Sequence, residues 1–256
     1  KDDMVYGLFS SYQDYKYKYQ IMKFCSRGRH LQTINLSGYN GNLNGKLMIA
    51  SNGEFVFANP IYEDAYYSTT HIVRFGSDGK FISSWDVKDA APAIIEEVRS
   101  FIITNNDKLA CLYNRDKKIY LFDLEGMNVK NFEVSEASNG YLPYNIYLNH
   151  KNQIVAYEAF TRSLQVFKLN GNLVSNFELI NSPNPQISGH KLCFDSSGNI
   201  YLHEFEPETI SKFAPDGDFK NVVVSTAKLT TPSAIYDGRG PYSNKLITQA
   251  PDGTIY

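Results

Sequence analysis

The chain has 256 residues, a formal net charge of −2 and 14% aromatic residues, with 19 Tyr and 16 Phe against 4 Met. Near-neutral charge argues against a nucleic-acid partner, which needs a basic surface to displace counterions from phosphates, and no run approaches the roughly 18 apolar residues of a membrane span. The aromatic-rich composition suits half-buried β-sheet surfaces, and a closed all-β architecture of about 250 residues can form one domain.

One pattern recurs five times along the chain: Ile or Leu, Phe three positions later, Gly four positions after that, and a large apolar residue six positions further on. The glycines at 28, 79, 126, 171 and 217 are 51, 47, 45 and 46 residues apart. A fixed period of about 40–50 residues is typical of a repeat architecture. The copies are Ile21-Phe24-Gly28-Ile34, Ile72-Phe75-Gly79-Trp85, Ile119-Phe122-Gly126-Phe132, Leu164-Phe167-Gly171-Phe177 and Ile210-Phe213-Gly217-Val223.

A second unit, two short strands around a tight turn, accompanies these copies. Its turns are two-residue linkers rich in Asn, Asp and Gly, which supply the positive φ angles that hairpins need. The predicted strand pairs are 47–51 with 54–58, 101–104 with 108–113, 146–149 with 153–157, 192–195 with 199–203, and 246–249 with 254–256. The Phe-containing pattern forms a second hairpin in each repeat, with its Gly in the turn.

Four strands in each repeat predict four-stranded antiparallel blades, and blades of this size arranged radially make an all-β β-propeller. We expect the Phe of each copy to fill the core between blades. Segment 90–98 is predicted to form at most one or two helical turns. Cys25, Cys111 and Cys193 fall within predicted strands, where we expect them to be small buried hydrophobes.

The fifth repeat carries a resemblance to a known family. Residues 194–201 read Phe-Asp-Ser-Ser-Gly-Asn-Ile-Tyr, and residues 210–217 read Ile-Ser-Lys-Phe-Ala-Pro-Asp-Gly. This segment resembles an NHL-type propeller repeat. The whole chain is similar to the six-bladed β-propeller proteins that are common among exported proteins of Bacteroidetes. The resemblance implies six blades and an exported protein of the periplasm or cell surface, rather than a cytoplasmic one.

Only five repeats can be counted, which leaves three arrangements open. In the first, residues 1–256 are one propeller domain in which the C-terminal strands of 246–256 and the N-terminal strands of 4–36 share a blade. In the second, the chain derives from a six-bladed parent whose remaining strands are absent. In the third, residues 225–245 hold a degenerate part of a blade.

The connections are unequal in length, and the longer ones are expected on one face. Between the hairpins of a blade lie 10–20, 59–71, 114–118, 158–163 and 204–209. Between blades lie 37–46, 88–100, 135–145, 180–191 and 225–245. A rigid scaffold that presents long loops on one side normally binds its ligand there.

These loops are rich in Tyr, which offers a large contact area and a hydroxyl at low entropic cost. Alternation of Tyr and Lys over 15–19 is equally consistent with an extended strand. Tyr141, Phe160, Phe205, Tyr236 and Tyr242 lie in the same set of loops. The candidate ligand-face residues are Tyr12, Tyr15, Tyr62, Tyr66, Tyr67, His71, Tyr113, Arg115, Tyr144, Glu158, Arg162, His190, His203 and Glu204.

Catalytic chemistry has weaker support. His71, His190, His203, Glu158 and Glu204 are the residues that could build a channel site for acid–base work or a divalent metal. However, the spacing His-Glu-x-x-His is absent, the His positions do not recur between blades, and neither a Gly-x-Ser-x-Gly elbow nor a phosphate-binding loop is present. We therefore predict neither catalytic residues nor metal ligands.

The sequence predicts a non-catalytic recognition module that binds a protein or carbohydrate through its Tyr-rich loop face, without a cofactor. Charges in these loops are mixed, which favours a protein or neutral ligand over a polyanion. The alternative is a propeller lyase or lactone hydrolase with a His and carboxylate site, and retention of a metal ion would distinguish the two. The oligomeric state is left open.

Overall fold

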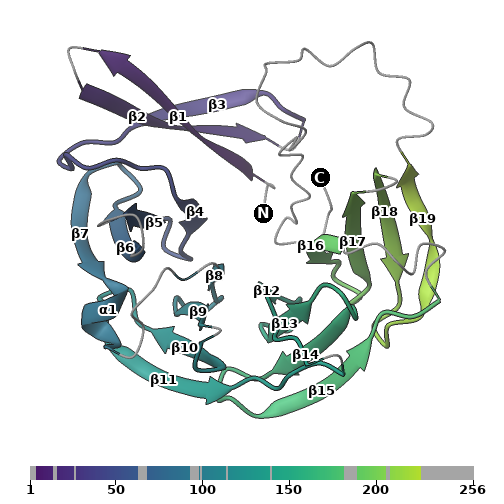
Figure 1. Ribbon diagram of the computed structural model, residues 1–256. Coiled ribbons are helices and arrows are strands. Elements are labelled where there is room, and N and C mark those ends of the chain that lie inside the picture. The colour runs from purple at the N-terminus through teal and green to yellow at the C-terminus, as the bar shows by residue number, and fades with distance from the viewer. Residues whose placement is uncertain are drawn as a thin grey trace. The chain divides into compact units, whose positions relative to one another are not determined.

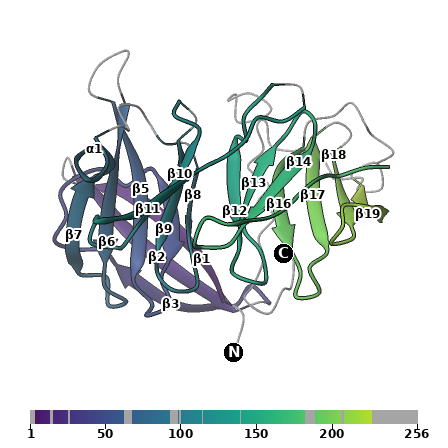
Figure 2. The same cartoon turned by 90° about the horizontal axis from the view of Figure 1, so that it is seen from below.

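The computed structural model describes residues 4–13, 16–25, 27–62, 68–92, 98, 100–113, 115–138, 140–181, 189–205 and 208–225. The described strands form five antiparallel sheets, in which consecutive strands are neighbours and alternate in direction (Figures 1 and 2). Four sheets have four strands and one has three. The predicted fold class, an all-β propeller of four-stranded antiparallel blades, is confirmed.

The chain divides into two compact units, the first comprising residues 1–135 and 144–146, and the second 136–143 and 147–256. Each unit is described by itself. The first sheet contains β1 (Met4–Gln13), β2 (Lys16–Cys25) and β3 (His30–Asn35). The second contains β4 (Lys46–Ile49), β5 (Phe55–Tyr62), β6 (Ser68–Phe75) and β7 (Phe81–Asp86), and the third β8 (Ser100–Ile103), β9 (Leu109–Tyr113), β10 (Lys118–Phe122) and β11 (Asn128–Glu133).

Two further sheets follow along the chain. The fourth contains β12 (Asn145–Leu148), β13 (Ile154–Glu158), β14 (Ser163–Phe167) and β15 (Leu173–Glu178). The fifth contains β16 (Gly189–Phe194), β17 (Ile200–Phe205), β18 (Glu208–Phe213) and β19 (Phe219–Ser225). One repeat therefore corresponds to one sheet. The Phe-containing pattern lies on the last two strands of each sheet, which are the third and fourth strands in the four-stranded sheets and β2 and β3 in the first sheet.

The repeated pattern is explained by packing between consecutive sheets. Phe75, Phe122, Phe167 and Phe213 are buried, as predicted, whereas Phe24 is half-buried. The Gly of the pattern has a separate role, which Gly79 illustrates. It closes its turn at a φ of +85°, and a Cβ there would lie 2.3 Å from the carbonyl oxygen of Asn35 on the preceding sheet.

Within each unit the hydrophobic core joins neighbouring sheets. One cluster in the first unit includes Ile21 and Ile34 of the first sheet with Phe57 and Phe75 of the second, and another joins the second sheet to the third. In the second unit a cluster joins Val155 and Leu164 to residues of the sheet β16–β19. Such apolar burial between sheets is the main favourable contribution to folding.

Two segments predicted as loops are mostly strand. Residues 10–13 and 16–20 continue β1 and β2, so the prediction of a loop over 10–20 is wrong and the alternative of an extended strand is right. The physical reason is the period-two alternation of Tyr with polar residues, which is the pattern of an extended strand. In the paired strands, Tyr12 lies opposite Tyr17. Likewise β5 continues to Tyr62 and β6 starts at Ser68, which shortens the predicted loop 59–71.

A short helix follows the second sheet. α1 (Val87–Ala90) is a four-residue helix that begins directly after β7, whereas most of the expected segment 90–98 lies outside the described residues. No helix in the described ranges is long and apolar enough to cross a membrane. Cys111 and Cys193 are buried as predicted, while Cys25 is half-buried. The predicted strands within 246–256, and hence their sharing of a blade with β1–β3, also lie outside the described residues.

Candidate functional site

The second unit presents two exposed aromatic rings side by side, which we call the aromatic pair. Tyr141 lies in the connection before β12, and Phe160 lies in the turn between β13 and β14. Their side chains are 57% and 69% exposed, with ring centroids 5.1 Å apart and planes inclined by 33°. This separation is within the range of favourable ring–ring contacts, so the two residues form one continuous apolar surface.

A buried carboxylate holds the turn that carries Phe160. Glu158 accepts hydrogen bonds at Oε1 from the Phe160 backbone N–H (2.9 Å) and at Oε2 from the Thr161 N–H (2.7 Å) and hydroxyl (2.6 Å). A buried carboxylate is stable only when such donors replace its lost hydration, and bonds to a charged acceptor are stronger than neutral ones. Glu158 thus fixes the backbone beneath the exposed ring.

Arg162 ends the same turn and connects it to the next sheet. It adopts a φ of +58°, a region that non-glycine residues seldom occupy. Its side chain is 5% exposed and its Nη2 lies 2.9 Å from Oε1 of Glu204, which is fully buried on β17. Oε2 of Glu204 accepts hydrogen bonds from the hydroxyls of Thr209 (2.9 Å) and Ser211 (2.7 Å).

Tyr157 is a buried polar group beside this network. Its side chain is fully buried next to Glu158, and its hydroxyl has no hydrogen-bond partner among the described residues. Burial raises the pKa of Tyr157 far above its usual value, so the phenol stays protonated. The neighbouring Tyr147 ring lies 6.4 Å away, centroid to centroid.

The first unit has its own exposed rings, at the tip of the β1–β2 hairpin. The centroids of Tyr12 and Tyr17 are 5.0 Å apart, and the ring of Tyr17 stacks on that of Tyr19 at 6.0 Å. These rings lie on paired strands, and no described carboxylate is seen to hold them as Glu158 holds the turn of Phe160.

His71 forms a pair with a carboxylate in the second sheet. Its Nδ1 lies 2.6 Å from Oδ1 of Asp86, directly across the β6–β7 ladder. The ring of Tyr39 stacks on His71 at 6.3 Å, and desolvation together with the Asp86 charge raises the pKa of Tyr39. A His–carboxylate pair can orient an imidazole for proton transfer. No group of three or more potential metal ligands occurs in the part of the chain that the structure describes.

The other predicted site residues are scattered. Tyr113 and His203 are buried, whereas Arg115 and Tyr144 are exposed. Tyr62 and His190 lie on β5 and β16, but their side chains are outside the described set, as are all of Tyr15, Tyr66 and Tyr67. The structure thus brings together Glu158, Arg162 and Glu204 from the predicted residues, and all three are buried.

Three further residues were missing from the candidate set. Phe160 is the single aromatic residue of its loop, and Tyr141 shares its loop with Tyr144 alone. A high local density of Tyr, the signal behind the candidate set, therefore does not identify them. Asp86 lies outside the loops of that set. Its position could have been found from the sequence, since it directly follows the last residue of the repeated pattern, opposite His71.

The comparisons with known proteins identify the fold. No protein-family model and no curated protein sequence matches the chain. Among solved structures, a protein of unknown function from Bacteroides caccae is 10% identical, with a TM-score of 0.52 over 83% of this chain and 78% of that one. A catalytically inactive variant of virginiamycin B lyase from Staphylococcus aureus is 16% identical, with a TM-score of 0.53 over 86% and 69%.

A luciferin-regenerating enzyme is 9% identical, with a TM-score of 0.51 over 88% of this chain and 76% of that one. Identities this low are informative about the fold alone, because one fold hosts many unrelated functions. The neighbours include enzymes and a protein of unknown function, and the chain shares with them the β-propeller fold.

Proposed function

We propose that this protein is a non-catalytic recognition module that binds a protein or carbohydrate partner through the aromatic pair, Tyr141 and Phe160. The observation that carries the proposal is the contrast between two strongly exposed rings and the buried carboxylate of Glu158 that fixes the turn beneath one of them. Exposed aromatic rings are preferred contact groups for partners. A turn that is already ordered loses little conformational entropy on binding.

The finer family assignment belongs to the same proposal. We infer that the blades are NHL-type repeats related to the six-bladed propellers of exported Bacteroidetes proteins. Its support is the motif over 194–201 and 210–217, together with one propeller neighbour from Bacteroides caccae. The long, mixed-charge loops named above would then form the binding face.

A second candidate function, a propeller lyase or lactone hydrolase, rests on the His71–Asp86 pair. The 2.6 Å contact orients the imidazole, as general base catalysis requires. A lyase among the fold neighbours is compatible with this candidate. It is the weaker of the two, because Tyr39, which stacks on His71, has a pKa raised above its usual value and is therefore a weak proton donor.

The test compares wild type with a Tyr141→Ser/Phe160→Ser variant in a glycan array and in affinity capture from the source organism. The matched control is Met127→Ser, which removes another strongly exposed apolar side chain, 68% exposed, in a different turn. We expect binding to be lost in the double variant and kept in the control, with unchanged melting of both. Equal binding by all three proteins contradicts the proposed site. A lactone or lyase activity that His71→Ala abolishes favours the enzyme instead.

A further inference from the structure

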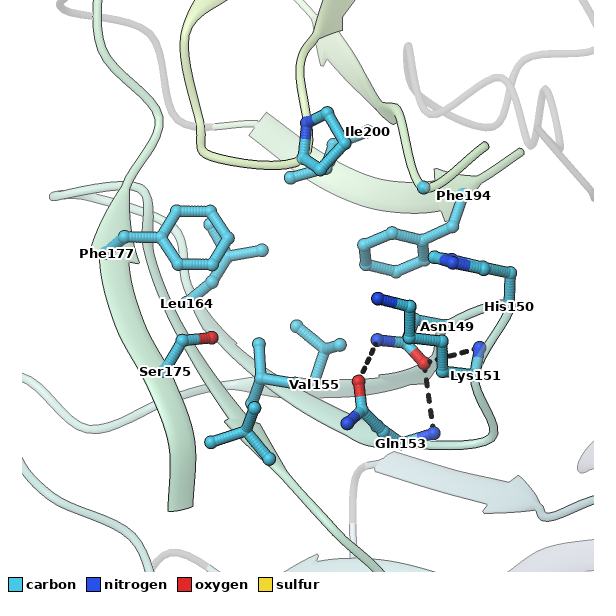
Figure 3. A pocket seen from close by; sticks show the side chains of 14 residues that line it. Asn149, His150, Lys151, Gln153, Val155, Leu164, Ser175, Phe177, Phe194 and Ile200 are labelled. Atoms are coloured by element: carbon cyan, nitrogen blue, oxygen red, sulfur yellow. Dashed lines mark hydrogen bonds between the residues drawn. The ribbon is translucent and has the colours of Figure 1, made fainter. Parts of the chain in front are cut away.

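A small pocket lies between the sheets β12–β15 and β16–β19 of the second unit. Its volume is about 150 Å³. The walls are mainly apolar and include Val155, Leu164, Phe194 and Ile200 (Figure 3). All four side chains are buried and belong to the hydrophobic cluster between the two sheets. The pocket is therefore a gap at the edge of the inter-sheet core that is open to solvent on one side.

The rim of the pocket is polar and well ordered. The Asn149 side chain accepts hydrogen bonds from the backbone N–H groups of Lys151 and Gln153 (both 3.0 Å) and donates one to the Gln153 side chain (2.9 Å) (Figure 3). The ring of His150 packs so closely on Gly198 that a Cβ there would lie 2.7 Å from it. This part of the rim belongs to the β12–β13 turn, at the opposite end of β13 from the turn that carries Phe160, and Ser175 on β15 contributes another part.

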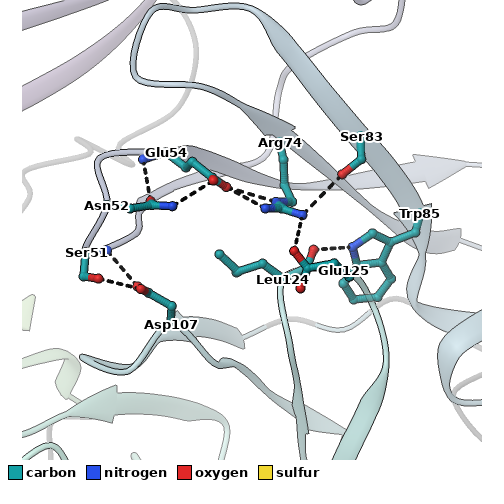
Figure 4. A network of polar contacts seen from close by, with 9 residues as sticks. All are labelled: Ser51, Asn52, Glu54, Arg74, Ser83, Trp85, Asp107, Leu124 and Glu125. Atoms are coloured by element: carbon teal, nitrogen blue, oxygen red, sulfur yellow. Dashed lines mark hydrogen bonds and ion pairs between the residues drawn. The ribbon is translucent and has the colours of Figure 1, made fainter.

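The first unit shows what occupies the same place in another pair of blades. Arg74 on β6 is equivalent to Val166 on β14, because each directly precedes the Phe of its repeat. Each also lies opposite a serine on the next strand, Arg74 opposite Ser83 and Val166 opposite Ser175. Arg74 is largely buried. It contacts Glu54 at 2.7 Å, Glu125 at 3.0 Å and Ser83 at 3.5 Å (Figure 4).

The partners of Arg74 also have counterparts in the second unit. Glu54 and Gln153 occupy equivalent positions, because each directly follows the positive-φ residue of its turn. Glu125 and Asp216 are likewise equivalent, because each directly precedes the Gly of its repeat. Trp85, which donates a hydrogen bond from its indole N–H to the Leu124 carbonyl at 3.1 Å (Figure 4), corresponds in the same alignment to the smaller Phe177.

The gap therefore has a simple origin. In the second unit, Val166 stands at the position of Arg74 and Gln153 at that of its partner Glu54. Phe177 stands at the position of Trp85, so a phenyl ring replaces the indole. The space that Arg74 fills in the first unit stays open between the sheets, and Val166, Ser175 and Phe177 all line it.

We propose that this pocket binds a small uncharged monocyclic molecule, about the size of phenol, with its ring against the apolar walls and one hydroxyl or amide group at the rim. A volume of about 150 Å³ is large enough for a benzene-sized ring. An ionised ligand would lose its hydration against these walls without a buried counter-charge. Ser175 and Gln153 at the rim offer a hydroxyl and an amide to the polar group of the ligand.

The experiment titrates the full chain with phenol and follows methyl signals by NMR. In wild type we expect saturable shifts of the Val155, Leu164 and Ile200 methyl groups, with Ile72 and Val73 of the first unit unchanged. A Val166→Arg/Gln153→Glu variant reproduces the Arg74–Glu54 arrangement and is expected to weaken phenol binding at least about tenfold. Val222→Arg, an arginine added at an exposed site outside the pocket, is the matched control.

Melting curves establish that each variant is folded. The proposal is wrong if phenol produces no saturable shift in the methyl signals of Val155, Leu164 and Ile200 in wild type. It is also wrong if a folded Val166→Arg/Gln153→Glu variant binds phenol as tightly as wild type. Should that variant fail to fold, Ser175→Phe, which narrows the pocket from its rim, takes its place with the same expected loss. Neither outcome depends on the aromatic pair.

Discussion

Arg162 and Glu204 form a buried ion pair with 2.9 Å between Nη2 and Oε1, and the pair joins two neighbouring sheets of the second unit. The arginine ends the turn that presents Phe160, and the glutamate is further bound by Thr209 and Ser211. The exposed aromatic pair and the buried polar network are therefore parts of one structure. The network positions the turn, while the ring of Phe160 meets solvent.

Replacing either partner of this pair is expected to destabilise the protein strongly. Arg162→Met or Glu204→Leu leaves one buried charge without its partner, which costs about 3–5 kcal/mol in the free energy of unfolding. The double variant Arg162→Met/Glu204→Leu should be less destabilised than the sum of the two single variants, because no unpaired charge remains. Urea unfolding of all four proteins measures this, and strictly additive losses would show that the two residues are not coupled.

Glu158→Leu is expected to loosen the turn that carries Phe160. The change removes the acceptor of two backbone N–H groups and one hydroxyl, and each donor left unsatisfied costs about 1–3 kcal/mol when buried. Thermal melting should show the loss of stability, and partner binding should weaken with it. Glu133→Leu, on the exposed surface of β11, is the control. The role assigned to Glu158 is wrong if hydrogen exchange of the Phe160 and Thr161 amides is unchanged.

Tyr157→Phe is expected to leave stability unchanged or to raise it by up to about 1 kcal/mol, since the hydroxyl it removes is buried without a partner in the described residues. Tyr147→Phe provides the comparison, because the Tyr147 hydroxyl interacts with the backbone of Leu192 and its loss should be destabilising. Urea midpoints measure both. A marked loss of stability in Tyr157→Phe would reveal a partner for its hydroxyl.

The three cysteines are expected to differ in reactivity. Hydrogen bonds from the backbone of Arg27 and Arg29 lower the pKa of the half-buried Cys25 thiol, whereas burial raises the pKa of Cys193 to about 12 and that of Cys111 further still. The thiolate is the reactive form, so iodoacetamide near pH 8 should modify Cys25 first. Mass spectrometry should find one modified thiol in the native protein and three after denaturation. Early labelling of Cys193 would contradict the burial of β16.

Local patterns were sufficient to predict most of the fold. The spacing from Ile72 through Phe75 and Gly79 to Trp85 identifies two strands and their turn, because strand periodicity and turn chemistry depend on neighbours in the chain. The same local reasoning was wrong for residues 10–20, where period-two alternation continues the hairpin. Loop length alone was thus a poor guide to where strands end.

The sequence by itself determined the repeat, the four-stranded blade and the burial of four of the pattern's five Phe residues, all but Phe24, since each depends on periodicity within about fifty residues. Only the tertiary structure decided that Arg162 meets Glu204, 42 residues further along the chain, and that a pocket lies where Val166 replaces the arginine of another blade. Both depend on how side chains of different sheets pack against each other. Close packing between sheets is set by shape and charge across the interface, which no pattern along one strand records.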